Sequence, residues 1–189
     1  MNRASLRLAQ WHRHVNGVNP PPALRPWLTG AASLTARLTA HCQRFRVRRL
    51  HQRRSLCLDD EAGLIGLPRR VKVWEREVLL QCDAVDVVFA HTIVANTANA
   101  SDWPLFGALG ERSLGSILFG DPQVRRGALE YARIKPGHPL HRRAQMASQC
   151  DAGAILYARR CTFRRRQGLL LVTEVFLPAL QSLRPAACC

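Results

Sequence analysis

Two charged side chains stand inside strongly apolar stretches, and they are the residues best placed to do chemistry. Arg76 lies in KVWEREVLLQ, and Glu174 lies in LLLVTEVFL. Burying an isolated charge is costly, so each side chain needs a partner, neutralisation or a ligand. A guanidinium suits a carboxylate, and a glutamate can accept a hydrogen bond from a hydroxyl group. The pair therefore indicates either a buried ion pair or the two ends of a ligand pocket.

The periodicity of the two stretches is that of β-strands. Arg76 shares a face with Trp74 and Val78, and Glu174 shares a face with apolar neighbours that include Val172. If both faces meet the same interior, the two side chains line one cavity. The alternative, an Arg–Glu pair that only organises the core, stays open here, although buried ion pairs are not reliable stabilisers.

Other chemical signatures are weak. The sequence contains no GxGxxG, GxxxxGK[ST], GxSxG or HExxH motif. His138 and His141 are three residues apart, but Pro136 and Pro139 make a metal-binding helical face unfavourable, so we expect a loop and no metal site. His91 lies inside an apolar strand, where a hydrogen-bonded histidine of the core or of a pocket is expected.

Strand patterns dominate the rest of the chain. Six stretches qualify, with ranges 45–58, 72–83, 87–95, 124–134, 155–166 and 169–177. Hairpins are expected at residues 84–86 and at the turn Gln167–Gly168. Two helical pieces are expected within 24–42, where Ser33 can cap the second, and further broken pieces within 101–119. The order predicts an α+β domain with a six-stranded antiparallel sheet and helices on one side.

Length and composition fit one folded domain. The 189 residues are 47% hydrophobic, yet no run approaches the length of a membrane span. The amino-terminal residues contain no apolar segment of the kind found in a secretory signal, so we expect no such signal. We expect a flexible N-terminal arm at 1–22, the domain at 23–182 and a disordered tail at 183–189. The seven cysteines are widely spaced and form no CxxC motif, which indicates free thiols in a reducing cytoplasm.

The net charge of +15 raises the possibility of a basic nucleic-acid-binding protein. Only Lys72 and Lys135 are lysines, however, and the arginines are spread through the predicted strands without stacking aromatics. We therefore expect no nucleic-acid partner, with this function kept as a lesser alternative.

The motifs in their order resemble the chorismate pyruvate-lyase family. Between about Pro22 and Ala179 the chain carries WEREVLLQ, AHTIVA, LGERSLGSILF, LYARRC and LLLVTEVFLPA. Members of this family release 4-hydroxybenzoate and pyruvate from chorismate at the start of bacterial ubiquinone synthesis. The resemblance implies this activity in the cytoplasm, and a single domain whose six-stranded antiparallel sheet and helices cover an enclosed ligand site.

The resemblance also implies the site residues. The family's ligand-binding arginine falls on Arg76 and its glutamate on Glu174, and we expect both to be catalytic. A leucine whose backbone lines the site falls on Leu114. Leu34 stands where the family has a methionine, in a segment that closes over the ligand. His91 stands where a family member has an arginine, and it would draw in the dianionic substrate less well at neutral pH.

The implied chemistry needs no cofactor. Loss of the enolpyruvyl group and of one ring proton makes the ring aromatic, so the enzyme must orient the substrate, exclude water and stabilise the departing enolpyruvate. Arg76 would grip a carboxylate. Glu174 would accept a hydrogen bond from the ring hydroxyl group or assist removal of the ring proton, and both roles stay open. Release of 4-hydroxybenzoate is expected to limit turnover and to require the segment around Leu34 to open.

The runner-up is a non-catalytic sensor domain for small aromatic acids. Effector domains of some bacterial transcription regulators resemble this fold, but such proteins normally carry an N-terminal DNA-binding module of about sixty residues or more. The roughly twenty residues before Pro22 are too few for one, which favours the enzyme. A monomer without a membrane span is expected.

Overall fold

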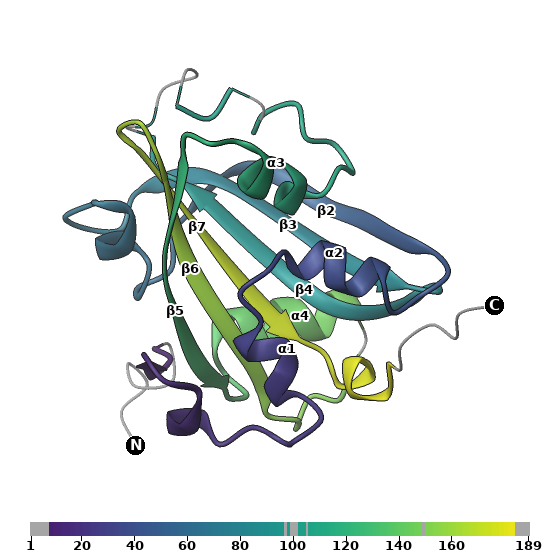
Figure 1. Cartoon of the computed structure of the whole chain (residues 1–189). Helices are drawn as coiled ribbons and strands as arrows, with labels where there is room; N and C mark the ends of the chain where they lie inside the picture. The colour runs from purple at the N-terminus through teal and green to yellow at the C-terminus, as the bar shows by residue number, and fades with distance from the viewer. Residues whose placement is uncertain (1–7, 97, 99–101, 105, 149, 184–189) are drawn as a thin grey trace.

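A twisted antiparallel sheet forms the centre of the protein (Figure 1). The computed structural model describes residues 8–96, 98, 102–104, 106–148 and 150–183. The strands are β1 (Trp11–His12), β2 (Phe45–Leu56), β3 (Lys72–Cys82), β4 (Val85–Val94), β5 (Val124–Ile134), β6 (Leu156–Arg165) and β7 (Gly168–Phe176). Their order across the sheet is β1-β5-β6-β7-β4-β3-β2, with every neighbouring pair antiparallel. The predicted α+β class and antiparallel sheet are confirmed.

The predicted count of six strands is wrong by one, because β1 adds a seventh at the edge of the sheet. Trp11–His12 pairs with β5 and is followed by the 3-10 helix η2 (Val15–Val18), whose two valines are buried. A two-residue strand has no periodicity that a sequence pattern can reveal. Residues 1–7 of the expected arm and residues 184–189 of the expected tail lie outside the described residues.

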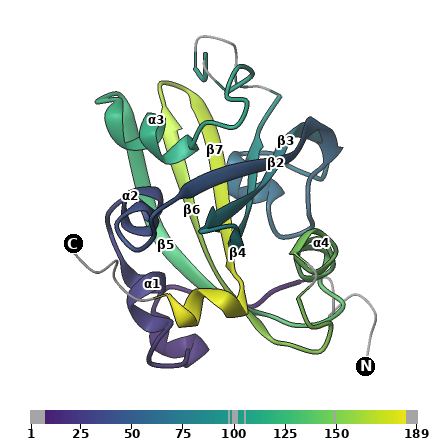
Figure 2. The ribbon, with the colours of Figure 1, turned by 90° about the vertical axis from the view of Figure 1, so that its right-hand side faces the viewer.

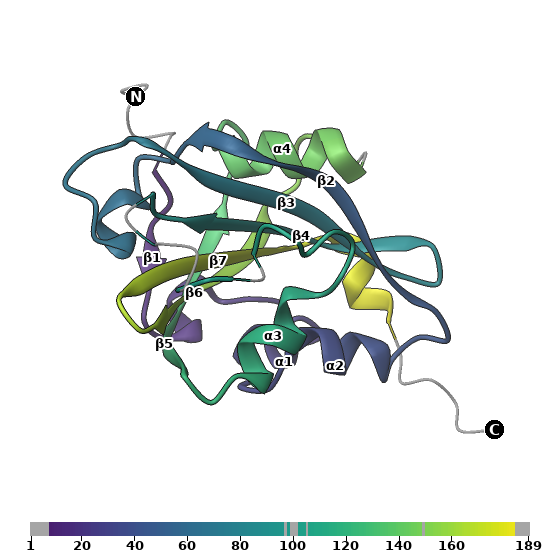
Figure 3. The same ribbon diagram turned by 90° about the horizontal axis from the view of Figure 1, so that it is seen from above.

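Helices cover both faces of the sheet, as Figures 2 and 3 show. Helices α1 (Arg25–Thr29), α2 (Leu34–Thr39) and α3 (Leu114–Gly120) lie on one face, and α4 (Pro139–Ser148) lies on the other. The 3-10 helices η3 (Ala62–Ile65) and η4 (Pro178–Ser182) complete the elements. The expected helices within 24–42 are confirmed, but the expectation of helices on one side only is wrong.

Helix α4 is the element that the sequence prediction missed. Pro139 is its first residue, a position where the missing backbone N–H has no intrahelical acceptor in any case. His138 Nδ1 accepts a hydrogen bond from the backbone N–H of Leu140 at 3.2 Å, and His141 Nε2 lies 2.7 Å from the carbonyl oxygen of Ala154. Both histidines are buried. His138 lies in the bend just before α4, so the predicted loop is confirmed there, whereas His141 lies inside the helix and the loop predicted for it is wrong.

Two apolar layers, one on each face, hold the sheet between the helices. The layer under α1 and α2 includes Trp27, Leu28, Leu38, Val78, Leu80, Val88 and Phe176. The layer under α4 includes Leu79, Phe89, Leu140, Ala144, Ala158 and Val175. Consecutive strand residues such as Val78 and Leu79 therefore enter different layers, and a side chain's position along its strand decides which face it serves.

Two further observations concern the described residues only. None of their helices combines the length and the apolar character that a bilayer crossing requires. Their five cysteines are free thiols, and all but Cys150 are buried. The other two, Cys188 and Cys189, lie outside the described part of the chain.

Candidate active site

A pocket lies between the sheet and the helices α2 and α3. Strands β3, β4, β6 and β7 supply most of its floor, and the first residues of α2 and α3 supply its roof. The apolar lining includes Leu34, Val78, Ala90, Leu114, Phe163 and Val172, and the charged lining consists of Arg76, Arg126, Arg159 and Glu174. Four of the five expected site residues therefore meet in this pocket, namely Leu34, Arg76, Leu114 and Glu174.

Arg76 is a buried cation without an ion-pair partner among the described residues. The residue is 2% exposed, and its Nη2 donates to the carbonyl oxygens of Gly110 at 3.1 Å and Arg112 at 2.9 Å. Its Nε is buried and has no hydrogen-bond partner. Burial, with a smaller contribution from the neighbouring Arg49 charge, lowers the pKa of Arg76 to about 10. The guanidinium is thus still charged at neutral pH, and a ligand carboxylate would supply the missing counter-charge.

Glu174 is fixed in the pocket by Arg159. Arg159 Nε lies 2.5 Å from Glu174 Oε2, across the β6–β7 hairpin. The Nη1 atom of the same guanidinium lies near the carbonyl oxygens of Trp27 (3.2 Å), Leu28 (3.2 Å) and Gly30 (2.9 Å) in and after α1. Arg159 therefore couples the carboxylate to the helical cover of the pocket, and the Arg76–Glu174 ion pair considered from the sequence is replaced by Arg159–Glu174.

A contact between two hydroxyl groups joins α2 to α3 in the roof of the pocket. Thr35 Oγ1 and Ser113 Oγ are 2.6 Å apart, and they join the first turn of α2 to the N-cap of α3. Gly115 allows this close approach, because a Cβ atom there would lie 3.0 Å from Ser33 Oγ and 3.1 Å from Thr35 Oγ1. Ser33 caps α2 as expected, with its Oγ accepting from the N–H of Ala36 at 3.4 Å.

Arg126 and Arg159 are pocket residues that the sequence analysis did not single out. Arg126 comes from β5 and reaches the pocket beside the ring of Phe119, with 5.5 Å between the guanidinium carbon and the ring centre. The available signal was the arginine content of VRRGALEY and LYARRC, two strands of which one adjoins the strand of Glu174. That signal was diluted by the many other arginines of this basic chain.

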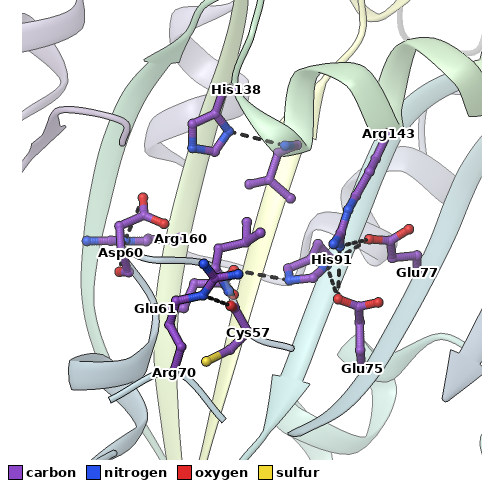
Figure 4. Close-up of polar contacts among 12 residues, drawn as sticks. Cys57, Asp60, Glu61, Arg70, Glu75, Glu77, His91, His138, Arg143 and Arg160 are labelled. Atoms are coloured by element: carbon purple, nitrogen blue, oxygen red, sulfur yellow. Dashed lines mark hydrogen bonds and ion pairs between the residues drawn. The ribbon is translucent and has the colours of Figure 1, made fainter. Parts of the chain in front are cut away.

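His91 lies on the opposite face of the sheet, so its expected place in the substrate site is wrong. In β4 the flanking residues Ala90 and Thr92 line the pocket, and strand alternation turns His91 away from it. The register explains the outcome, since His91 stands opposite Glu77 in β3, whereas Thr92 stands opposite Arg76. Figure 4 shows the environment that His91 does occupy.

That environment is a network of charges in which three glutamates surround two cations, His91 and Arg143. His91 Nε2 lies 3.1 Å from Glu61 Oε1, and its Nδ1 lies 3.0 Å from Glu77 Oε1. Arg143, from α4, places Nη1 2.8 Å from Glu75 Oε2 and 2.6 Å from Glu77 Oε1 (Figure 4). We call these five residues the buried charge network. It binds α4 and the η3 region to strands β3 and β4, and it is separated from the pocket by the sheet.

The pKa values within the network follow from its charges. Burial alone would raise the pKa of Glu77, but hydrogen bonds and charge from His91 and Arg143 outweigh it and lower the pKa to about 2. Burial alone would lower the pKa of His91, but Glu61 and Glu77 raise it to about 10. His91 is therefore an imidazolium at neutral pH and serves as a structural cation.

One group of side chains on this face has the residue types of a metal site. His51, Glu75 and Glu77 each offer a ligand atom, and these atoms lie within 4.8 Å of one another. His51 Nε2 is already 2.9 Å from Glu77 Oε2, and both glutamates are engaged by Arg143. Protein groups thus already pair with His51 Nε2, with Glu77 and with one oxygen of Glu75, whereas Glu75 Oε1 has no hydrogen-bond partner.

Replacing His91 with glutamine is expected to destabilise the protein without weakening the binding of a ligand in the pocket. Glu61 and Glu77 would lose a shared buried cation, which should cost about 3 kcal/mol in the free energy of unfolding. Urea unfolding at pH 7 measures the loss. Affinity for 4-hydroxybenzoate, the product that the family resemblance implies, should be unchanged when it is measured by titration calorimetry at a temperature where the variant is folded. A weakened affinity with normal stability would return His91 to the ligand site.

The chain is similar to known proteins over almost its whole length. A sequence profile of the family described as chorismate lyase matches residues 5–183. A probable chorismate pyruvate-lyase of Ralstonia nicotianae is 49% identical over 177 residues, covering 89% of this chain and 91% of the relative. One of Cupriavidus metallidurans is 47% identical over 174 residues, with coverages of 91% and 81%. One of Dechloromonas aromatica is 41% identical over 179 residues, with coverages of 95% and 100%.

Solved structures with a similar fold have much lower identity. The effector domain of PhnF from Mycobacterium smegmatis gives a TM-score of 0.55 at 15% identity, covering 79% of this chain and 90% of that domain. The C-terminal domain of the histidine utilization repressor from Pseudomonas syringae gives 0.52 at 12% identity, with coverages of 77% and 100%. At these identities the likeness concerns the fold alone.

Proposed function

Because this chain belongs to the chorismate lyase family and is therefore an enzyme of the lyase type, we propose that it converts chorismate into 4-hydroxybenzoate and pyruvate. The observation that carries the proposal is Arg76, a buried guanidinium without an ion-pair partner among the described residues, in the same pocket as a fixed glutamate. A dianionic hydroxy acid supplies the carboxylate that Arg76 lacks as a partner and a hydroxyl group that Glu174 can orient.

The residues have separate roles in this proposal. Arg76 grips a carboxylate of the substrate, and Glu174 accepts a hydrogen bond from the ring hydroxyl through the oxygen that Arg159 does not occupy. Leu34 and Leu114 contribute backbone and apolar contacts from the roof. The bond between the ring carbon and the ether oxygen breaks, so that the enolpyruvyl group leaves with that oxygen. The proton on the hydroxyl-bearing ring carbon also leaves, and the ring becomes aromatic. Enolpyruvate takes up a proton to become pyruvate.

The substrate itself supplies the driving force, so the protein has to contribute only orientation and electrostatics. Orientation of the ring hydroxyl is the role of Glu174 that its ion pair with Arg159 supports. A carboxylate held at one oxygen by a guanidinium that also binds three carbonyl oxygens has a defined direction. We extend the proposal to a cytoplasmic monomer that encloses its ligand and supplies 4-hydroxybenzoate for ubiquinone synthesis, as the family resemblance implies.

The test is incubation of the purified protein with chorismate in the presence of EDTA and without added cofactor. Equal amounts of 4-hydroxybenzoate, measured by chromatography, and pyruvate, measured with lactate dehydrogenase, are expected. Binding of 4-hydroxybenzoate without any turnover of chorismate would overturn the proposal in favour of a sensor of aromatic acids. Growth of a strain that requires 4-hydroxybenzoate for ubiquinone, restored by expression of this chain, tests the pathway.

Replacing Thr35 with valine is expected to loosen the roof of the pocket and to speed product release. The variant keeps the β-branched shape but loses the hydrogen bond to Ser113, which is worth about 0.5–1.5 kcal/mol. Affinity for 4-hydroxybenzoate should fall about 2- to 10-fold, with kcat rising if release limits turnover. Product inhibition and stopped-flow bursts measure both quantities.

Thr39→Val is the matched control, because Thr39 is an exposed residue of the same helix whose hydroxyl bonds only the carbonyl oxygen of Thr35. It should leave product affinity unchanged. An unchanged product affinity in Thr35→Val, or the absence of a product burst in the wild type, would contradict release as the slow step.

A further inference from the structure

Arg126 presents a second guanidinium to the pocket from the side opposite β3. It lies in β5, immediately before Gly127, at an irregularity in the pairing of β5 with β6 that begins at Arg126. Its side chain reaches between Phe119 of α3 and Cys161 of β6, both of which line the pocket. Arg126 and Arg76 therefore belong to strands on opposite sides of β7, the strand that carries Glu174.

The bonding capacity of this guanidinium is largely unused. Its Nη1 donates to the carbonyl oxygen of Ala31, and it contacts the Cys161 thiol. Its Nε is buried and has no hydrogen-bond partner, and within the described residues no carboxylate pairs with it. Arg159, by contrast, has an ion pair with Glu174 through Nε, and its Nη1 lies near three carbonyl oxygens, so its charge is already paired within the protein. Arg126 is therefore able to take a ligand anion, whereas Arg159 is already occupied.

The charges of the pocket lead to the same conclusion. Its lining holds three guanidinium groups and one carboxylate, which leaves two positive charges. Chorismate carries two carboxylates, one on the ring and one on the enolpyruvyl group. Arg76 can grip one of them, and a second cation is needed for the other. His91 cannot serve, since the sheet separates it from the pocket.

We propose that Arg126 forms a second carboxylate subsite of the pocket, which binds the enolpyruvyl carboxylate of the substrate and retains it on the departing enolpyruvate. This inference rests on the proposed function. Because Arg126 also holds the Ala31 carbonyl in the connection between α1 and α2, occupation of the subsite would draw that connection over the ligand. A product that lacks the enolpyruvyl carboxylate makes no use of the subsite.

The test compares ligands that have and lack that carboxylate. In Arg126→Gln, the KM for chorismate should rise about 100-fold, and inhibition by pyruvate should be lost. The inhibition constant of 4-hydroxybenzoate should stay within about twofold of the wild type, because its one carboxylate binds Arg76 and its hydroxyl group binds Glu174. Arg126→Lys, which keeps the charge but lacks the planar fork, should recover part of the loss.

Arg125→Gln is the matched control, since Arg125 precedes Arg126 in the same strand, is exposed and does not line the pocket. It should behave as the wild type. Equal losses for chorismate and 4-hydroxybenzoate in Arg126→Gln, or no loss for either, would overturn the subsite. If the wild type does not cleave chorismate, the proposed function fails. Calorimetric affinities for chorismate and 4-hydroxybenzoate would then decide the subsite separately, by the same comparison.

Discussion

Replacing Arg76 with methionine is expected to reduce kcat/KM for chorismate by about 10²- to 10⁴-fold while leaving the protein as stable as the wild type or more stable. Losing a buried, charge-assisted contact to a substrate carboxylate accounts for the kinetic loss, which corresponds to about 3–5 kcal/mol. The stability result has a separate cause. Arg76 is buried without an ion-pair partner among the described residues, so removal of its charge relieves desolvation in the ligand-free protein.

Steady-state kinetics and urea unfolding on the same preparation measure the two effects. Arg49→Met is the matched control, because Arg49 is an exposed neighbour whose charge lowers the pKa of Arg76 without lining the pocket. It should retain activity. Near wild-type turnover in Arg76→Met would remove Arg76 from the site. A loss of activity accompanied by a large loss of stability would indicate that Arg76 organises the fold.

Strand alternation was sufficient to predict the floor of the pocket. The sequence placed Arg76 with Val78 on one face of its strand, and Glu174 with Val172 on one face of another. All four residues line the pocket. Two-residue periodicity is set by the pleat of each strand and needs no knowledge of its neighbours. What alternation cannot show is which faces of different strands point the same way, and His91 was misplaced for that reason.

The partner of Glu174 was missed through a shift of one residue in a turn. The turn was predicted at Gln167–Gly168, but Gly168 is the first residue of β7 and pairs with Arg165. The left-handed residue of the turn is Arg166, with φ of 52°. In a two-residue hairpin the turn fixes the register, so the predicted turn would have placed Cys161 opposite Glu174. The observed turn places Arg159 there.

Helix α4 and the buried charge network were both missed by the sequence prediction, for the same reason. The two prolines near His138 suggested a loop, and without α4 no local pattern places Arg143 beside the sheet. Contacts between residues 66 and 68 positions apart, such as those of Arg143 with Glu77 and Glu75, depend on how the chain returns to the sheet. Local pattern carries no information about that return.

The second large effect is expected in Arg143→Met, which should destabilise the protein by about 3 kcal/mol at pH 7, because the buried Glu75 and Glu77 would lose the partly exposed guanidinium that pairs with both of them. The loss should depend on pH. In the wild type the pKa of Glu77 is lowered to about 2, so its stabilising contribution is present above its ordinary value of 4.5 and is lost as pH falls towards 2. The pKa of His91 is raised to about 10, so its contribution is fully present below 6.5 and is lost as pH rises through 10.

Wild-type stability should therefore be greatest between about pH 4.5 and 6.5 and decline on both sides, as far as these two groups determine it. Removal of Arg143 takes away one of the charges that hold Glu77 ionised, so the variant should differ most from the wild type near neutral pH and converge with it in acid. Urea unfolding at pH 3, 5.5, 7 and 9 measures this, with the adjacent exposed Arg142→Met as control. A deficit of the same size at pH 3 and pH 7 would mean that packing of the Arg143 side chain, rather than its charge, holds α4 on the sheet. Ligand binding in the pocket should be unchanged in either case, because the network and the pocket lie on opposite sides of the same strands.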